Sequence, residues 1–194
     1  MCGSEWERGE KEENSSVNCT GIHYQANIKM SDYEYRSGIG YDVHQFAEGR
    51  KCILGGVEIP HHVGLLGHSD ADVLCHAIAD SILGALGLPD IGYYFPPSDD
   101  SIEGISSLKI LEKCASLVAE KGARLVNVDS MLIAEAPKVM KHRDAMIANL
   151  AAALDLAPDR VNIKATTNET MGFVGREEGI AALANCSIAL PISL

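Results

Sequence analysis

Apolar residues follow two different periods along the chain, beginning at about residue 36. In five segments they alternate with polar residues or form short apolar runs, which is the pattern of β-strands. In three longer segments they recur at the spacing of a helix with one buried face. The predicted strands are residues 37–46, 52–59, 125–135, 161–166 and 180–190, and the predicted helices are residues 70–86, 106–121 and 138–154.

Local signals mark the ends of the first two helices. Ser69 is a suitable N-cap for the first helix, which Gly87 and Pro89 end, and Gly122 ends the second. Because strands and helices are interleaved, the pattern is typical of an α/β or α+β domain. The polar, glycine-containing loop at residues 167–178 has no evident structural reason, so we expect it to be functional.

Residues 1–35 differ from the rest of the chain. They are polar, carry seven acidic and three basic residues, and lack apolar periodicity. We interpret them as a disordered N-terminal extension and residues 36–194 as the folded domain. An upstream start codon, with Met30 as the true first residue, is the alternative. A transit peptide is disfavoured because such segments are basic and poor in acids.

Composition and charge exclude several classes of protein. The formal net charge of −11 argues against a nucleic-acid partner, because duplex binding requires clustered Lys and Arg. No apolar run reaches the length of a membrane-spanning helix, so we expect a soluble protein without a membrane partner. The six cysteines include no C-x-x-C pair, and we expect reduced thiols in a cytoplasmic compartment.

Two short motifs together predict a metal site. Asp42 and His44 are two positions apart on a predicted strand and therefore point to the same face. Asp72, His76 and Asp80 are four positions apart on a predicted helix. Asp42, His44 and His76 make a three-ligand set suited to zinc, with the fourth tetrahedral position free. Asp72 or Asp80 would then be the acceptor that fixes the tautomer of an imidazole.

Each motif alone also has a simpler interpretation. The pair on the strand is common on solvated surfaces, and His76 between two carboxylates fits a hydrogen-bonded core histidine.

A third motif is KATTNE at residues 164–169, which leads into MGFVGR at residues 171–176. Its hydroxyls, turn N–H groups, arginine and carboxylate fit a phosphate site with a divalent cation, or an exposed hairpin loop.

Several strings closely resemble the 2-C-methyl-D-erythritol 2,4-cyclodiphosphate synthases, in order and in spacing, over about residues 36–192. They are GYDVHQF, LGGVEIP, GLLGHSDADVLCHAIADSILGALGLPDIG, NVDSMLIAEAPK and VNIKATTNETMGFVGREEGIAA. The resemblance implies a four-stranded mixed sheet with helices on one face, in a ferredoxin-like arrangement. It also implies a homotrimer with active sites between subunits.

The implied reaction belongs to the non-mevalonate isoprenoid precursor pathway. In it, 4-diphosphocytidyl-2-C-methyl-D-erythritol 2-phosphate is cyclised to 2-C-methyl-D-erythritol 2,4-cyclodiphosphate, and CMP is released. The enzyme would be a phosphorus-oxygen lyase without a covalent intermediate. We expect a cytoplasmic location in a bacterium, or a plastid-type organelle in a eukaryote.

The resemblance also implies roles for individual residues. Asp42, His44 and His76 match the ligands of one Zn²⁺ per site, and Glu169 matches the acid that holds Mg²⁺ or Mn²⁺ with the substrate phosphates. His68 and Thr167 match residues that stabilise the transition state. The other residues that match substrate contacts are Ser69, Asp90, Gly92, Phe95, Ser98, Asp99, Ala134, Pro137, Lys138, Met140, Ala165, Thr166, Asn168, Phe173 and Arg176, together with Asp42, His44, Thr167 and Glu169.

Pro97 departs from the family pattern, where many members have Asp, so a carboxylate contact is in doubt there. Two other functions fit the same motifs. A zinc hydrolase would use the three ligands to activate water. A trimeric nucleotide or isoprenoid-phosphate binding module would bind without turnover. The preceding pathway enzymes are partners of some relatives, and the sequence leaves such a complex open.

Overall fold

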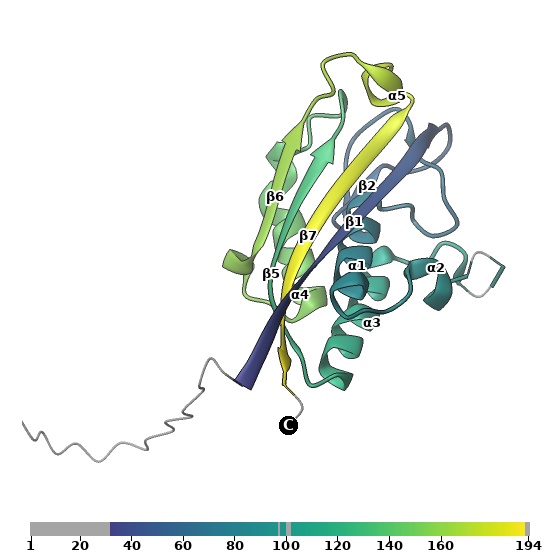
Figure 1. Ribbon diagram of the computed structural model, residues 1–194. Helices are drawn as coiled ribbons and strands as arrows, with labels where there is room; N and C mark the ends of the chain where they lie inside the picture. Colours follow the sequence, from purple (N-terminus) through teal and green to yellow (C-terminus); the bar gives the residue numbers. More distant parts are fainter. Residues whose placement is uncertain (1–31, 97, 100–101, 193–194) are drawn as a thin grey trace, which may run out of the picture.

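A single mixed sheet forms the centre of the molecule (Figure 1). The computed structural model describes residues 32–96, 98–99 and 102–192. The strands lie in the order β4-β1-β7-β5-β6. Their bounds are Tyr33–Ala47 for β1, Gly64–Leu65 for β4, Arg124–Ile133 for β5, Val161–Thr166 for β6 and Gly179–Pro191 for β7.

The sheet differs in two respects from the expected one. It has five strands rather than four, because the short strand β4 pairs with the end of β1 at Phe46 and Ala47. Strands β5 and β6 are parallel, and the other pairs are antiparallel. The four long strands follow the chain order β-α-β-α-β-β, whereas a ferredoxin-like unit has the order β-α-β-β-α-β.

The predicted strand at residues 52–59 is a small separate hairpin. Strand β2 (Ile53–Leu54) pairs with strand β3 (Val57–Glu58), and the two glycines between them form the turn. Both glycines have positive φ, which is why this turn needs glycine. The first predicted strand, residues 37–46, is also longer than expected. Strand β1 begins at Tyr33, inside the segment that was expected to be an N-terminal extension. Residues 1–31 of that extension lie outside the described residues.

The helices agree with the apolar spacing, with shifted ends. Helix α1 begins only at Val73, because Asp72 rather than Ser69 is its N-cap and accepts a hydrogen bond from the Cys75 N–H (3.1 Å). The predicted helix at residues 138–154 is divided into a 3₁₀ turn and helix α4. The remaining bounds are Val73–Ala85 for α1, Ile91–Tyr94 for α2, Ser107–Glu120 for α3, Met140–His142 for the 3₁₀ turn, Arg143–Leu154 for α4, Pro158–Arg160 for a second 3₁₀ turn and Gly172–Gly175 for α5.

Helix α1 packs against the sheet at backbone distance. A Cβ at Gly38 would lie 1.9 Å from the Ser81 carbonyl oxygen, and one at Gly40 would lie 1.9 Å from the Ala77 carbonyl oxygen. Only glycine permits this approach of strand β1 to the helix. The close packing brings the first turn of α1 directly over the end of β1.

Helices α1, α3 and α4 cover one face of the sheet, and Figure 1 shows them behind it, whereas α5 lies at one end of the sheet. On the opposite face, strand β1 presents large apolar side chains to solvent within this single chain. They are Tyr35, Ile39, Tyr41 and Val43, which are 42% to 70% exposed. None of the helices in the described part of the chain is long and apolar enough to cross a membrane.

Candidate active site

Three polar side chains meet where α1 crosses the end of β1. Asp42 and His44 point from the strand toward the helix, and His76 meets them from the first turn of α1. The His76 Nδ1 atom is 3.0 Å from the Asp42 Oδ2 atom and 3.0 Å from the His44 Nε2 atom. The remaining pair, His44 Nε2 and Asp42 Oδ2, is also 3.0 Å apart.

This triangle has the dimensions of a metal site. Three ligands of a tetrahedral zinc ion, at bond lengths of about 2.0–2.1 Å, lie about 3.3 Å from one another. The three atoms need to move apart by only a few tenths of an ångström to accept such an ion. The group formed by Asp42, His44 and His76 could therefore hold a divalent metal, as the spacing of the two motifs predicted.

The partners of the two imidazoles fix which nitrogen faces the metal position. The His44 Nδ1 atom is 2.6 Å from the Leu66 carbonyl oxygen, so Nδ1 carries the proton and Nε2 is left as a ligand. The His76 Nε2 atom lies 3.1 Å from the Ser69 Oγ atom and 2.9 Å from the Ser107 Oγ atom. These hydroxyls leave the His76 Nδ1 atom free to bind a metal.

The expectation that Asp72 or Asp80 orients an imidazole is wrong. The Asp72 carboxylate accepts hydrogen bonds from the Cys75 N–H (3.1 Å) and the Gly56 N–H (2.7 Å), since it caps α1 and holds the β2–β3 turn. Asp80 accepts from the Ile91 N–H (2.9 Å) and so holds the start of α2. The sequence gives no sign of Ser107, because its contact with His76 depends on how α3 packs against α1.

Protons and charge are strongly coupled in this group. Burial alone raises the pKa of Asp42, but hydrogen bonds from His44 and His76 outweigh burial and hold that pKa far below its ordinary value of 3.8. Burial lowers the pKa of His44. The hydrogen bond and the charge attraction of Asp42 together outweigh this effect and raise the pKa above its ordinary value of 6.5. Asp42 is thus ionised, and a proton on His44 would compete with a metal held by this group.

A cavity of ≈ 230 Å³ opens beside the three residues. His68 and Ser69 line it, and the Nε2 atom of the half-buried His68 is 3.3 Å from the Asp99 carbonyl oxygen. The remaining wall is apolar, which the sequence did not indicate. It consists of Ile91, Phe95, Ile102, Ile105 and Ile110, together with Gly92.

Asp90, Ser98 and Asp99 belong to the segment beside this cavity. Asp90 is the N-cap of α2, and its side chain accepts from the Tyr93 N–H (3.3 Å). Ser98 and Asp99 are exposed. Pro97, where the family pattern raised a doubt, lies outside the described residues.

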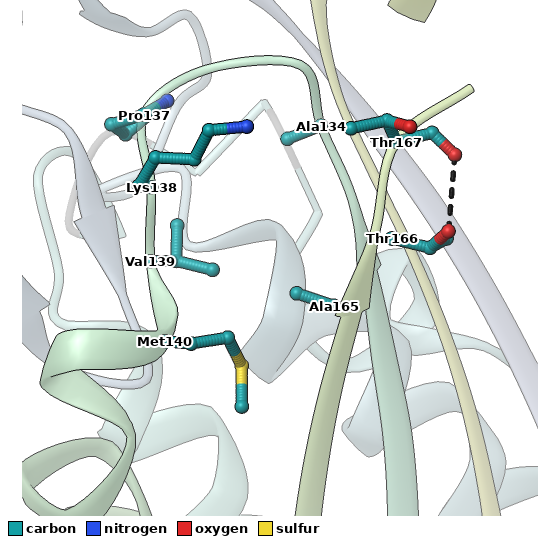
Figure 2. A pocket seen from close by; sticks show the side chains of 8 residues that line it. All are labelled: Ala134, Pro137, Lys138, Val139, Met140, Ala165, Thr166 and Thr167. Atoms are coloured by element: carbon teal, nitrogen blue, oxygen red, sulfur yellow. Dashed lines mark hydrogen bonds between the residues drawn. The ribbon is translucent and has the colours of Figure 1, made fainter. Parts of the chain in front are cut away.

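A second cavity, also of ≈ 230 Å³, lies where strands β5 and β6 end (Figure 2). The structure here brings together two segments that are far apart in the chain and that both contain residues matching substrate contacts of the resembling family. The lining residues are Ala134, Pro137, Lys138, Val139, Met140, Ala165, Thr166 and Thr167. In Figure 2 the Lys138 side chain extends along the rim of this cavity.

The side chain of Glu135 anchors the loop after β6 through two hydrogen bonds. Its Oε1 atom accepts hydrogen bonds from the Asn168 N–H (2.9 Å) and the Thr170 N–H (3.1 Å). Glu169, which lies between Asn168 and Thr170, has a positive φ. Its Oε1 atom accepts a hydrogen bond from the Thr167 hydroxyl (2.9 Å). The sequence does not indicate the role of Glu135, because its partners come from a distant segment of the chain.

The two cavities are separate within one chain. They share no lining residue, and β7 lies between β1 and β5 in the sheet. Phe173 lies on α5 and Arg176 directly after it, where the Arg176 Nε atom pairs with Glu178 (2.7 Å). The two cavities therefore account for only part of the predicted site residues. Those that line neither cavity are Asp90, Ser98, Asp99, Asn168, Glu169, Phe173 and Arg176.

Several curated proteins of similar sequence share the name 2-C-methyl-D-erythritol 2,4-cyclodiphosphate synthase. The family model for the YgbB family matches residues 35–189. The 2-C-methyl-D-erythritol 2,4-cyclodiphosphate synthase of Akkermansia muciniphila is 59% identical over 159 residues, which are 81% of this chain and 94% of the relative.

Two solved structures are similar over most of the chain. The bifunctional IspDF of Campylobacter jejuni is 42% identical, with a TM-score of 0.78, and the match covers 81% of this chain and 43% of that one. The IspF of Plasmodium falciparum, solved as a CDP complex, is 35% identical, with a TM-score of 0.70, and the match covers 82% of this chain and 97% of that one.

Proposed function

The chain belongs to the YgbB family, and we propose that it is an enzyme with the activity for which its curated relatives are named. It converts 4-diphosphocytidyl-2-C-methyl-D-erythritol 2-phosphate to 2-C-methyl-D-erythritol 2,4-cyclodiphosphate and releases CMP. It is thus a cyclising lyase of isoprenoid precursor synthesis. The observation that carries this proposal is the convergence of Asp42, His44 and His76 on one point at the rim of a cavity that also contains His68.

Asp42, His44 and His76 hold one Zn²⁺ in this proposal. One ionised carboxylate and two imidazoles are a donor set that zinc favours, and each imidazole already has a partner on its other nitrogen. Glu169, together with substrate phosphates, holds a second divalent cation, Mg²⁺ or Mn²⁺. When bound, these cations neutralise phosphate charge and align the reacting phosphates.

The reaction needs no nucleophilic side chain. An oxygen of the 2-phosphate attacks the β-phosphorus, a P–O bond closes the ring, and the bond from the β-phosphorus to the oxygen of CMP breaks. Such a transfer depends on alignment and on stabilisation of charge. His68 and Thr167 provide donors for this charge in the proposal, and each lines one of the two cavities.

The cavity at the ends of β5 and β6 receives the cytidine moiety. Its apolar walls suit a pyrimidine base, and Lys138 at the rim suits a phosphate (Figure 2). A Plasmodium falciparum relative solved with CDP supports a cytidine ligand. The sugar and phosphates extend toward the remaining proposed contacts, namely Ser69, Asp90, Gly92, Phe95, Ser98, Asp99, Asn168, Phe173 and Arg176.

A homotrimer completes the site by joining the metal-side cavity of one subunit to the nucleotide cavity of its neighbour. Two observations support this arrangement. The cavities are separate within one chain, and the uncovered face of β1 carries the exposed side chains of Tyr35, Ile39, Tyr41 and Val43. An apolar sheet face of this kind is typical of a subunit contact.

The function is tested with the diphosphocytidyl substrate and the protein before and after removal of its metal. We expect CMP release by the metal-loaded protein, no release after chelation, and recovery when Zn²⁺ and Mg²⁺ are added back. Tight binding of the substrate without CMP release would support a binding module instead and would contradict the proposal.

A further inference from the structure

We propose that Asp70 and Ser107 are positioning residues for the metal ligand His76. In this relay Asp70 orients the Ser107 hydroxyl, and that hydroxyl holds the His76 ring with its Nδ1 atom toward the metal. The inference rests on the metal site of the proposed function. It adds two residues from outside the ligand set, one of them on a different helix.

The relay occupies the back of His76. His76 is 7% exposed and Ser107 is fully buried. The front nitrogen, Nδ1, faces Asp42 and His44, while the Nε2 atom is 2.9 Å from the Ser107 Oγ atom. A metal can bind through Nδ1 only in the tautomer that carries its proton on Nε2. The group that accepts the Nε2 proton therefore affects how strongly His76 can bind a metal.

Asp70 determines the direction of the serine hydroxyl. The Ser107 Oγ atom is 2.5 Å from the Asp70 Oδ1 atom, and a carboxylate oxygen can only accept there. The hydroxyl proton is thus committed to Asp70, and the lone pairs of Ser107 remain for the His76 Nε2–H group. The result is a carboxylate–serine–histidine chain ending at the metal position.

Ser69 has a lesser role in the same cluster. Its Oγ atom is 3.1 Å from the His76 Nε2 atom, farther than that of Ser107, and it also accepts a hydrogen bond from the Ala71 N–H (3.1 Å). No carboxylate contact is described for its hydroxyl, which is 3.3 Å from the Ser107 Oγ atom. The stronger and better oriented acceptor for His76 is Ser107.

The same carboxylate fixes where Ser107 sits. Ser107 is the first residue of α3, and its N–H donates to the Asp70 Oδ2 atom (3.1 Å), while Ser106 at the N-cap makes no capping bond. Asp70 therefore caps α3 with one oxygen and orients the hydroxyl with the other. Because Ile105 and Ile110 on either side of Ser107 line the adjacent cavity, one pair of residues aligns both the metal ligand and this wall.

The zinc affinity of the whole chain tests the relay, measured by competition with a chromophoric chelator. For Ser107→Ala we expect zinc binding about 10–100 times weaker, the usual effect of losing a partner behind a ligand. The matched control is Ser106→Ala, the same change one residue away on an exposed side chain, which we expect to bind zinc like the native protein. Asp70→Asn should also weaken zinc binding, because an amide does not fix the hydroxyl direction.

A second readout separates this role from a purely structural one. In ¹⁵N NMR of the zinc-loaded protein, the His76 Nε2–H proton should be protected from exchange with solvent by its bond to Ser107, and this protection should be lost in Ser107→Ala. Native zinc affinity in folded Ser107→Ala and Asp70→Asn proteins would overturn the proposal. If Ser107→Ala does not fold, Asp70→Asn decides alone. A native chain that binds zinc but does not cyclise substrate would refute the proposed function and leave the relay intact, whereas one that binds no divalent metal would refute the relay.

Discussion

The Asp42 Oδ2 and His44 Nε2 atoms are 3.0 Å apart, and a metal held by both would have to displace any proton between them. The pKa of His44 lies above its ordinary 6.5, mainly because the Asp42 carboxylate offsets the effect of burial. Proton and metal compete for the same Nε2 atom. The sequence predicted this group because Asp42 and His44 are two positions apart on one strand, and because His76 lies on the polar side of a helix. It could not predict Ser107 or Leu66, whose contacts arise from tertiary packing.

Zinc affinity should therefore rise with pH above 6.5, by about tenfold per pH unit for each proton displaced, until His44 is neutral. The stability of the metal-free protein should change in the opposite direction. A raised histidine pKa stabilises the fold below 6.5, and this stabilisation is lost as the pH rises through the folded-state value. Chelator competition and thermal unfolding from about pH 6 to about pH 8 measure both. A zinc affinity independent of pH across this range would contradict the assignment of His44.

At the scale of elements, the segment from β4 to α1 is held by a single guanidinium. The Arg50 side chain donates to the carbonyl oxygens of Leu65 (3.1 Å), Gly67 (3.1 Å) and Ser69 (2.7 Å). The intervening Leu66 carbonyl faces the other way, toward His44. Arg50 thus helps to place His68, Ser69 and the Leu66 carbonyl that faces His44, together with backbone hydrogen bonds such as Gly104 N–H to the His68 carbonyl (2.8 Å).

Arg50→Met should cost about 1–3 kcal/mol of stability, because partly buried carbonyl groups lose their donor. It should also weaken zinc binding, since the Leu66 carbonyl is no longer fixed. Lys51→Met is the control, because the neighbouring Lys51 pairs with Glu58 on the surface. Denaturant unfolding and chelator competition measure the two effects. Equal behaviour of the two variants would exclude this role for Arg50.

Two glycines on opposite sides of the α1–β1 contact should respond in opposite directions to alanine. In Gly40→Ala the new Cβ would lie 1.9 Å from the Ala77 carbonyl oxygen, so the helix must move, at a cost of about 3 kcal/mol or more. In Gly84→Ala, within α1, the nearest described atom is 3.8 Å away, and we expect a gain of about 0.5–1 kcal/mol. Denaturant unfolding compares them. Similar effects of both changes would contradict the packing described here.

Element positions were predictable where the apolar period was long, and their ends were not. The spacing of apolar residues located α1, α3 and the four long strands. The start of α1 was misplaced because Ser69 and Asp72 are both good N-caps, and only the Cys75 N–H contact distinguishes them. The fifth strand was missed because β4 has two residues and is defined by its pairing with β1.

At the scale of the whole molecule, the separate cavities predict that subunits complement one another. His76→Ala removes a metal ligand and should abolish both zinc binding and turnover, and Lys138→Ala should impair the nucleotide cavity. In randomly mixed trimers, about a quarter of the interfaces would combine two intact halves and regain turnover. Mixed and unmixed variants are compared by CMP release. A fully active monomer in light scattering, or mixtures without recovered activity, would contradict a shared site.

The structure of the reaction product tests the central claim most directly, because only cyclisation distinguishes this enzyme from a zinc hydrolase. The native protein, loaded with Zn²⁺ and Mg²⁺, is incubated with the diphosphocytidyl 2-phosphate substrate and followed by ³¹P NMR. Our account predicts that CMP appears together with an equal amount of a cyclic diphosphate, whose two phosphorus atoms are coupled to each other. CMP accompanied by an open-chain bisphosphate, with no coupled pair, would mean that water is the nucleophile and would contradict it.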